Sequence, residues 1–350
     1  MTPRGGEAVY KSEGHPFVRS QNIGLGHLIL DDIAYIDEDT HQRQKNTELQ
    51  LDDVLLNITG ASIGRSALVN QQIVGGNVNQ HVCIIRANKK LIPSFLCNFL
   101  LSQYGQKQIE SFQAGGNRQG LNFEQIKSIK IGLPSVEEQK KIADLLLLIE
   151  QRITTQNKII EDLKKLKSAI RKKMFSLLKD EYTESFEINQ LLDYEQPTAY
   201  IVANDEYSTD TSLTPVLTAN KGFILGYTDE KFGIYQKGEC IIFDDFTMDA
   251  KYVSFPFKVK SSAIKILTAK PNVNLRFMFE YLSYWELKSE GHKRHYISEI
   301  ASLVIELPSK ERQSIIASLM TSLNSKLDIE AKTKIRYEEQ KRYLLSQMFI

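Results

Sequence analysis

The chain has 350 residues, of which 42% are hydrophobic and 25% are charged, and its formal net charge is +1. This composition argues against a disordered or low-complexity protein, and the length allows two globular cores. A net charge so close to zero does not by itself indicate a nucleic-acid binder.

Cysteine usage and the absence of targeting signals point to one compartment. Cys83, Cys97 and Cys240 are far apart and lack the spacing of zinc ligands, which favours a reducing environment. The first residues contain no apolar core for a signal peptide, and the longest apolar run, at residues 145–149, is too short to span a membrane. We therefore expect a cytoplasmic protein.

Residues 1–132 alternate short β-rich runs with polar turns, which predicts a first domain of the α+β class. One helix is expected from Pro93 to about Phe112. A further strand is expected from Ile126, leading into Leu133. The earlier strand-like runs begin at Phe17, Ile33, Asp53, Ser66 and His81.

Three polar loops rich in glycine lie in this first domain, at residues 57–65, 75–81 and 114–120. Their Asn, Gln and Arg side chains are types that read base edges, and Ser, Thr and backbone amides suit phosphates. Ordinary turns also require glycine and asparagine, so loop composition alone leaves their function open.

A long helix is predicted at residues 133–175, and a second version of it stands at residues 307–350. A shift of 174 residues superposes the two without a gap, and 15 of 53 aligned positions are identical. This identity indicates an internal duplication. Pro precedes each helix, Ser135 or Ser309 can cap it, and Glu138 completes a capping box in the first copy only.

The apolar residues of both helices follow a four-three spacing, which is typical of a coiled-coil seam. Polar residues interrupt the seam at Gln156 and Lys167 and, at the matching places of the second copy, at Glu330 and Lys341, with Lys334 as a further exception. The first helix would be about 55 to 60 Å long. We expect the two helices to pack on each other.

Residues 176–306 predict a second α+β domain whose order of elements resembles that of the first, although the residues differ almost everywhere. A helix is expected from Leu275 to about Lys288. The strand-like runs begin at Pro215, Gly222, Glu239, Lys251, Ala263 and Ala301, and the polar loops lie at residues 218–222, 243–251 and 291–296.

The sequence contains no strong catalytic motif, and two weak candidate sites. Asp244, Asp245 and Asp249 could be imagined as metal ligands, and Glu286 with Lys288 as part of a nuclease site, so an active DNA nuclease remains one alternative. The histidines show no triad or metal spacing. A coiled-coil adaptor without a DNA role is a second alternative. We expect that the chain catalyses no reaction and holds no metal or cofactor.

Residues 58–69, 76–86 and 133–146, with the long helix that follows, resemble the first target-recognition domain and central conserved region of the specificity subunits of type I restriction-modification systems. Residues 241–267 and 307–320 resemble the second target-recognition domain and the distal conserved region. The repeated Leu-Pro-Ser-x-Glu-x-Gln helix starts make the match specific. Fewer residues precede the first domain's strands than the second's, so we expect the chain to start inside its first domain.

The resemblance implies that the two long helices pack as an antiparallel coiled coil and give the chain approximate two-fold symmetry. It also implies that each domain reads one half of a bipartite, asymmetric DNA site, with half-sites roughly 10 base pairs apart. Two modification subunits carrying S-adenosylmethionine and two restriction subunits using ATP and Mg would be the partners, and this chain would supply only the specificity. By residue type, the expected DNA contacts are Arg65, Asn77, Asn79, Gln80, Arg118 and Gln119 in the first domain and Asn220, Lys221, Lys251, Lys293 and Arg294 in the second.

Overall fold

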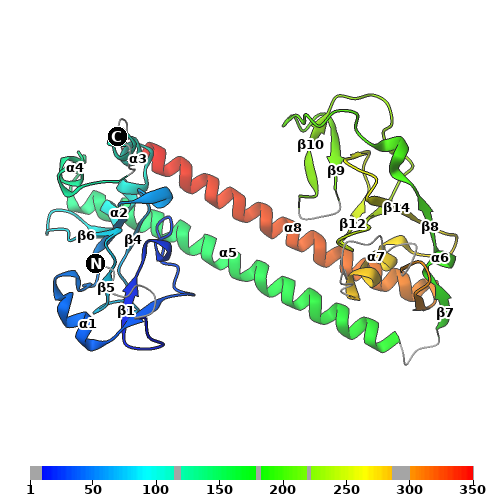
Figure 1. The fold of residues 1–350 in the computed structure, drawn as a ribbon, viewed down its shortest axis with the longest axis horizontal. Coiled ribbons are helices and arrows are strands. Elements are labelled where there is room, and N and C mark those ends of the chain that lie inside the picture. Colours follow the sequence, from blue (N-terminus) through cyan, green and yellow to red (C-terminus); the bar gives the residue numbers. More distant parts are fainter. Residues whose placement is uncertain (1–9, 114–119, 179–182, 219–221, 286–299, 350) are drawn as a thin grey trace. The chain divides into compact units, whose positions relative to one another are not determined.

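The computed structural model describes residues 10–113, 120–178, 183–218, 222–285 and 300–349. The chain divides into two compact units, unit 1 with residues 1–158 and 331–350, and unit 2 with residues 159–330. Each unit contains an α+β domain and a part of both long helices, α5 (Val136–Leu177) and α8 (Lys310–Gln347) (Figure 1). The predicted fold class, with two domains and two long helices, is confirmed. No helix in the described ranges is long and apolar enough to cross a membrane.

The domain of unit 1 is built on two three-stranded sheets. In one, β1 (His15–Val18) pairs antiparallel with β2 (Ala34–Ile36) and parallel with β5 (Asn77–Val78). In the other, β3 (Val54–Asn57) is the fully buried centre. Its antiparallel neighbours are β4 (Ser66–Leu68) and β6 (Val82–Ile85), and the remaining elements are α1 (Glu38–Arg43), α2 (Pro93–Leu101), α3 (Gln103–Ser111) and α4 (Phe123–Ser128).

The helix predicted at residues 93–112 is two helices, because Ser102 starts a new one. Its extended backbone ends α2, and its hydroxyl accepts the N–H of Gly105 at 3.1 Å, which caps α3. A side chain at position 105 would place a Cβ 2.2 Å from the Phe99 carbonyl oxygen. Glycine therefore permits the close turn between the two helices.

The prediction of a strand from Ile126 is wrong. Asn122 and Gln125 form a reciprocal capping box with two 2.9 Å hydrogen bonds, and α4 follows. At Lys130 the backbone N–H and carbonyl both bond to the side chain of Gln108, each at 2.8 Å. The matching segment of unit 2, β15 (Val304–Leu307), is a strand because it pairs with another strand.

The domain of unit 2 repeats the sheet order of unit 1. Here β9 (Thr214–Leu217) lies between β10 (Ile224–Thr228) and β13 (Lys258–Val259). The second sheet has β11 (Cys240–Asp244) between β12 (Ala250–Val253) and β14 (Ile264–Ala269). Three elements have no counterpart in the described part of unit 1: β7 (Glu184–Glu187), α6 (Ile188–Leu191) and β8 (Leu192–Glu195). Strand β7 pairs with β15, and β8 pairs with β14. Helix α7 (Leu275–Tyr284) corresponds to α2 of unit 1.

Two buried glutamines at matching positions attach each domain to its long helix. In unit 1, Gln139 of α5 accepts the N–H of Ile92, at the start of α2, at 2.9 Å and donates to the Lys90 carbonyl at 3.0 Å. In unit 2, Gln313 of α8 accepts the N–H of Asn274, at the start of α7, at 2.9 Å. The duplicated residue therefore has the same structural role in both units.

The polar interruptions of the seam are paired, and the two helices run antiparallel within each unit. In unit 1, Lys341 donates to the Glu150 carboxylate at 2.5 Å, and Tyr337 contacts Arg152. Residue numbers therefore fall along α8 where they rise along α5, which is the antiparallel direction. In unit 2, Lys167 donates to Asn324 at 2.5 Å. At the next turns of the same pair, α5 and α8 contribute Phe175 and Ile316 to one buried cluster.

Candidate nucleic-acid interface

Backbone hydrogen bonds bring the three predicted polar loops of the first domain together. The N–H of Ile58, at the start of the first loop, donates to the carbonyl of His81, which ends the second, at 3.0 Å. The carbonyl of Ile58 accepts from Leu121, directly after the third loop, at 2.8 Å, and Thr59 forms a bridge with Gly120. Residues far apart in the sequence thus share one end of the domain.

Among the predicted contact residues of this domain, Arg65 and Gln80 are exposed at the joined loops. The amide nitrogen of Gln80 lies 3.2 Å from Nε2 of His81, and Nδ1 of His81 lies 2.6 Å from the Thr59 hydroxyl. Asn79 is largely buried, and its side-chain oxygen accepts the N–H of His81 at 3.1 Å, so this side chain shapes the turn. Arg118 and Gln119 lie outside the described residues.

The structure places Asn77 in the interior, where it organises the domain. Its amide nitrogen donates to the Gln44 carbonyl at 2.9 Å and to the Thr47 hydroxyl at 3.1 Å. Its oxygen therefore faces Nδ1 of the buried His41, 2.7 Å away, as an acceptor. Because the side chain is fully buried and committed on both sides, it is unsuited to a direct base contact.

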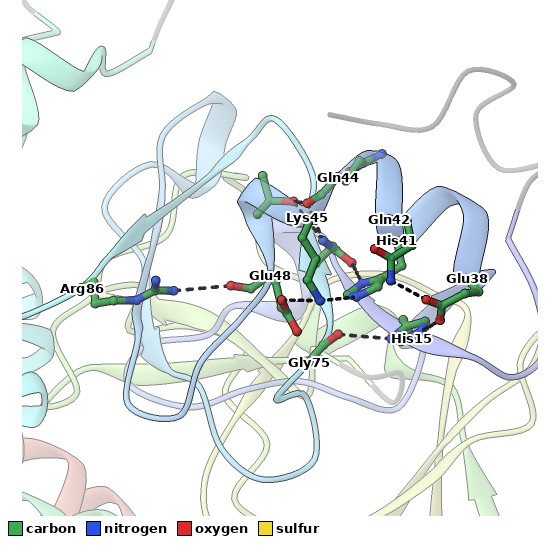
Figure 2. Close-up of polar contacts among 11 residues, drawn as sticks. His15, Glu38, His41, Gln42, Gln44, Lys45, Glu48, Gly75 and Arg86 are labelled. Carbon is green, nitrogen blue, oxygen red and sulfur yellow. Dashed lines mark hydrogen bonds and ion pairs between the residues drawn. The ribbon is translucent and has the colours of Figure 1, made fainter.

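The rings of two histidines, His15 and His41, stack on each other in this domain (Figure 2). The rings of His15 and His41 are 3.8 Å apart and nearly parallel. The two nitrogens of His15 face the Glu38 carboxylate at 2.6 Å and the Gly75 carbonyl at 3.3 Å, and both of these groups are acceptors. Nε2 of His41 instead lies 3.5 Å from the Lys45 ammonium.

Acidic pH is expected to weaken unit 1 through this network. Hydrogen bonds from Gln42 and then His15 lower the pKa of Glu38 from 4.5, and a hydrogen bond from Lys45 lowers that of Glu48. A carboxyl whose pKa is lower in the folded state stabilises the fold above about pH 4.5, and this contribution is lost as the pH falls through the folded-state pKa. Thermal unfolding of Glu38→Gln should therefore change less than that of the wild type between about pH 5 and pH 3.

Glu137→Gln, which removes an exposed carboxylate from α5, is the matched control and should keep the wild-type pH dependence. Equal pH dependence of Glu38→Gln and wild type would contradict a role for this network in acid stability.

In the second domain, residues 243–251 form a tight loop held by its own aspartates. The Asp244 carboxylate accepts the N–H groups of Phe246 and Thr247, each at 2.9 Å. The Asp245 carboxylate lies 3.4 Å from the ammonium of Lys265, and both side chains are buried. Lys251 is half-buried on β12, opposite Ile242 of β11.

Asp244 and Asp245 thus have structural partners, and no group of three potential metal ligands occurs within the described ranges. Asn220, Lys221, Lys293 and Arg294, and also Glu286 and Lys288 of the nuclease alternative, lie outside those ranges.

Sequence reasoning missed the side chains that hold the loops. Thr59 and His81 lie inside predicted loops, but their mutual contact depends on strand pairing across 22 residues. The buried Lys258 was also missed. It lies opposite Val216 in the parallel pair of β13 with β9, donates to the Phe232 carbonyl at 2.6 Å and pairs with Glu230 at 2.8 Å. The sequence signal that could have identified Lys258 is its position as a charged residue within a β-rich run.

Comparison with known proteins matches both halves of the chain to one family. Residues 7–165 and 181–339 each match the family described as the type I restriction modification DNA specificity domain. The EcoR124I/EcoR124II specificity subunit of Escherichia coli is 39% identical over 178 residues, which is 45% of this chain and 43% of that subunit. The putative MjaX specificity subunit of Methanocaldococcus jannaschii is 24% identical over 366 residues, 95% of this chain and 86% of that protein.

Solved structures show the same fold. The type I restriction-modification S subunit from M. genitalium has a TM-score of 0.64 and 15% identity, covering 98% of this chain and 91% of that one. A chain from a study of assembly and conformational transition in the type I system has a TM-score of 0.58 and 14% identity, covering 95% and 90%. At these identities the likeness concerns the fold alone.

Proposed function

Because the chain belongs to the type I restriction modification DNA specificity family, as its two matched halves show, we propose that it reads a bipartite, asymmetric DNA sequence. Each domain reads one half. The observation that carries this proposal is the repetition of one sheet order in both units, whose sequences differ in the loops between the strands. Two readers that share a frame but differ in surface chemistry suit a site whose halves differ in sequence.

In this proposal the chain supplies the specificity of a larger complex, and its partners carry the reactions. The resemblance to restriction enzyme specificity subunits supports partners that methylate adenine with S-adenosylmethionine and partners that translocate and cut DNA with ATP and Mg.

Two copies of one modification subunit would bind this chain. Leu145 of α5 and Leu319 of α8 are duplicated positions, and both are 39% exposed. Equal apolar exposure at matching sites of the repeat is what two identical partners require.

The proposed DNA contacts combine the exposed residues of the joined loops with residue types suited to bases. Arg65 and Gln80 are the base contacts on the described surface of the first domain, while Asn77 and Asn79 hold the loop that carries Gln80. Lys251 is half-buried and suits a phosphate better than a base edge. Arg118, Gln119, Asn220, Lys221, Lys293 and Arg294 complete the proposed set by residue type.

Base-resolution methylation mapping tests the function directly. Cells that produce this chain with its partner modification subunit are compared with cells that lack this chain. A new split, asymmetric adenine-methylation motif is the expected result. An unchanged methylome would contradict the proposal. Metal-dependent cutting by the purified chain would then favour a nuclease, and partner binding without dependence on DNA sequence would favour an adaptor.

Gln80→Ala is expected to relax one half of the motif and leave the other half unchanged. A glutamine amide can pair two-fold with adenine, and losing such a contact lowers discrimination by about 1–3 kcal/mol. The measurement is the methylated motif together with binding to matched and single-substituted duplexes.

Gln71→Ala is the control for Gln80→Ala, because it removes the same group from the connection that follows β4. The neighbouring bond from the Val69 N–H to the Asp53 carbonyl places this connection at the other end of the β3–β4 hairpin from the joined loops. A change in both half-sites, or in neither, would exclude Gln80 as a base contact.

A further inference from the structure

The two domains correspond residue by residue around one turn of the second domain. In the parallel pairs, Phe17 is opposite Asn77 in unit 1, and Val216 is opposite Lys258 in unit 2. Two residues further on, the N–H of Asn79 donates to the carbonyl of Val18 at 3.1 Å. The N–H of Lys260 donates to the carbonyl of Leu217, also at 3.1 Å. Lys260 therefore occupies the position of Asn79.

A second hydrogen bond fixes the other end of the turn. In unit 1 the N–H of Ile58 donates to the carbonyl of His81 at 3.0 Å, and in unit 2 the N–H of Asp245 donates to the carbonyl of Ala263 at 3.0 Å. The turn at residues 260–263 is thus the counterpart of residues 79–81, with one residue more. Its exposed side chains are those of Lys260, Ser261 and Ser262.

A buried ion pair holds this turn. Lys265 is 1% exposed and Asp245 2% exposed, and the Lys265 ammonium also donates to the carbonyl of Ser262 at 3.4 Å. By strand register, the corresponding residues of unit 1 are the uncharged Cys83 and Ile58. A buried ion pair contributes little net stability compared with apolar residues. The pair instead fixes the position of the turn, because Lys265 contacts both Ser262 of the turn and Asp245 of residues 243–251.

We propose that Lys260 reads a guanine in the half-site of the second domain, an inference that rests on the proposed function. Its side chain is exposed, and no hydrogen bond or ion pair engages its ammonium among the described residues. A lysine can donate to both O6 and N7 of guanine in the major groove, whereas Gln80 of the first domain suits adenine. The two readers thus present different chemistry from corresponding turns.

The test compares wild type, Lys260→Ala and Lys310→Ala, each produced with the partner modification subunit. Lys310 is an exposed lysine at the start of α8, so its replacement removes an equal charge away from the turn. Methylation mapping gives the motif, and duplex binding at several salt concentrations gives the affinity. Circular dichroism checks that each variant folds.

Lys260→Ala is expected to relax one G·C position in one half-site, with discrimination there falling roughly 5- to 150-fold, while Lys310→Ala keeps the wild-type motif. An unchanged motif with weaker binding to all sequences and a salt slope smaller by about one would show a phosphate contact and overturn the inference. No change in motif or affinity would also overturn it. A wild-type chain without any motif would overturn the proposed function together with this inference.

Discussion

Glu280→Ala is expected to lower the free energy of unfolding of unit 2 by about 3–5 kcal/mol, because it leaves two half-buried cations without their partner. Glu280 of α7 is fully buried. Its carboxylate accepts from Arg171 at 2.8 and 3.0 Å and from Asn324 at 3.3 Å, and Lys167 lies 3.8 Å away. The measurement is calorimetric or denaturant unfolding of the purified chain.

The pH dependence of the same variant gives an independent readout. Burial lowers the pKa of Lys167 from 10.5, and Glu280 partly opposes this shift. When the pKa of a lysine is lower in the folded state than in the unfolded state, the unfolded chain binds more protons at pH values between the two. The free energy of unfolding therefore rises as the pH increases from the folded-state pKa to the unfolded-state pKa. Without Glu280 the pKa of Lys167 should fall further, so the variant should recover more stability than the wild type toward alkaline pH.

Glu161→Ala is the control for Glu280→Ala. Glu161 forms an exposed pair with Lys165 on α5, and its loss should change stability by less than about 1 kcal/mol. Similar effects for Glu161→Ala and Glu280→Ala would mean that burial does not strengthen the cluster around Glu280.

Phe349→Ala is expected to destabilise unit 1 by about 3–5 kcal/mol, because it removes a buried aromatic ring from a packed cluster. Phe349 is 5% exposed, and its ring centre lies 5.1 Å from that of Phe95 and 6.0 Å from that of Phe99, both on α2. A calorimetric scan should show the loss in the transition of unit 1.

The duplication offers a matched variant for unit 2. Phe175 stands at the corresponding position of α5 and packs on Phe277 and Tyr281 of α7, with ring centres 5.6 and 4.9 Å apart. Phe175→Ala should affect the transition of unit 2 by a similar amount. Phe232→Ala, at a side chain that is 87% exposed, should affect neither. Equal loss from Phe232→Ala and Phe349→Ala would contradict this account.

Helix boundaries and strand positions illustrate what local sequence can and cannot predict. The long helices were predictable because their apolar spacing, their capping serines and their freedom from Pro and Gly are local. The strand expected from Ile126 failed for two reasons. A capping box at Asn122 starts a helix there, and residue 130 bonds to a glutamine side chain, whereas β15 has β7 beside it. A strand is stable only with a neighbour to pair with, and the neighbour is not a local property.

The candidate interface also contains residues that the local sequence could predict and residues that it could not. Loop composition predicted DNA contacts at Arg65 and Gln80, and the structure exposes both side chains, as expected of polar residues in surface loops. It gave no means to distinguish Asn77, which the structure buries against His41, because an asparagine in a loop reads the same whether it faces solvent or the interior. The turn at Lys260 became visible only through strand register and paired hydrogen bonds.

The sequence by itself determined the duplication, the two long helices with their polar interruptions, the α+β class of both domains and the resemblance to the family. Each of these is carried by local spacing or by a repeat that needs no spatial information. Only the tertiary structure decided which loops meet, which polar side chains turn inward, and which lysine of the second domain matches Asn79 of the first. Those outcomes depend on pairing between strands far apart in the chain, and the free energy of such pairing is set by the partner as much as by the residue itself.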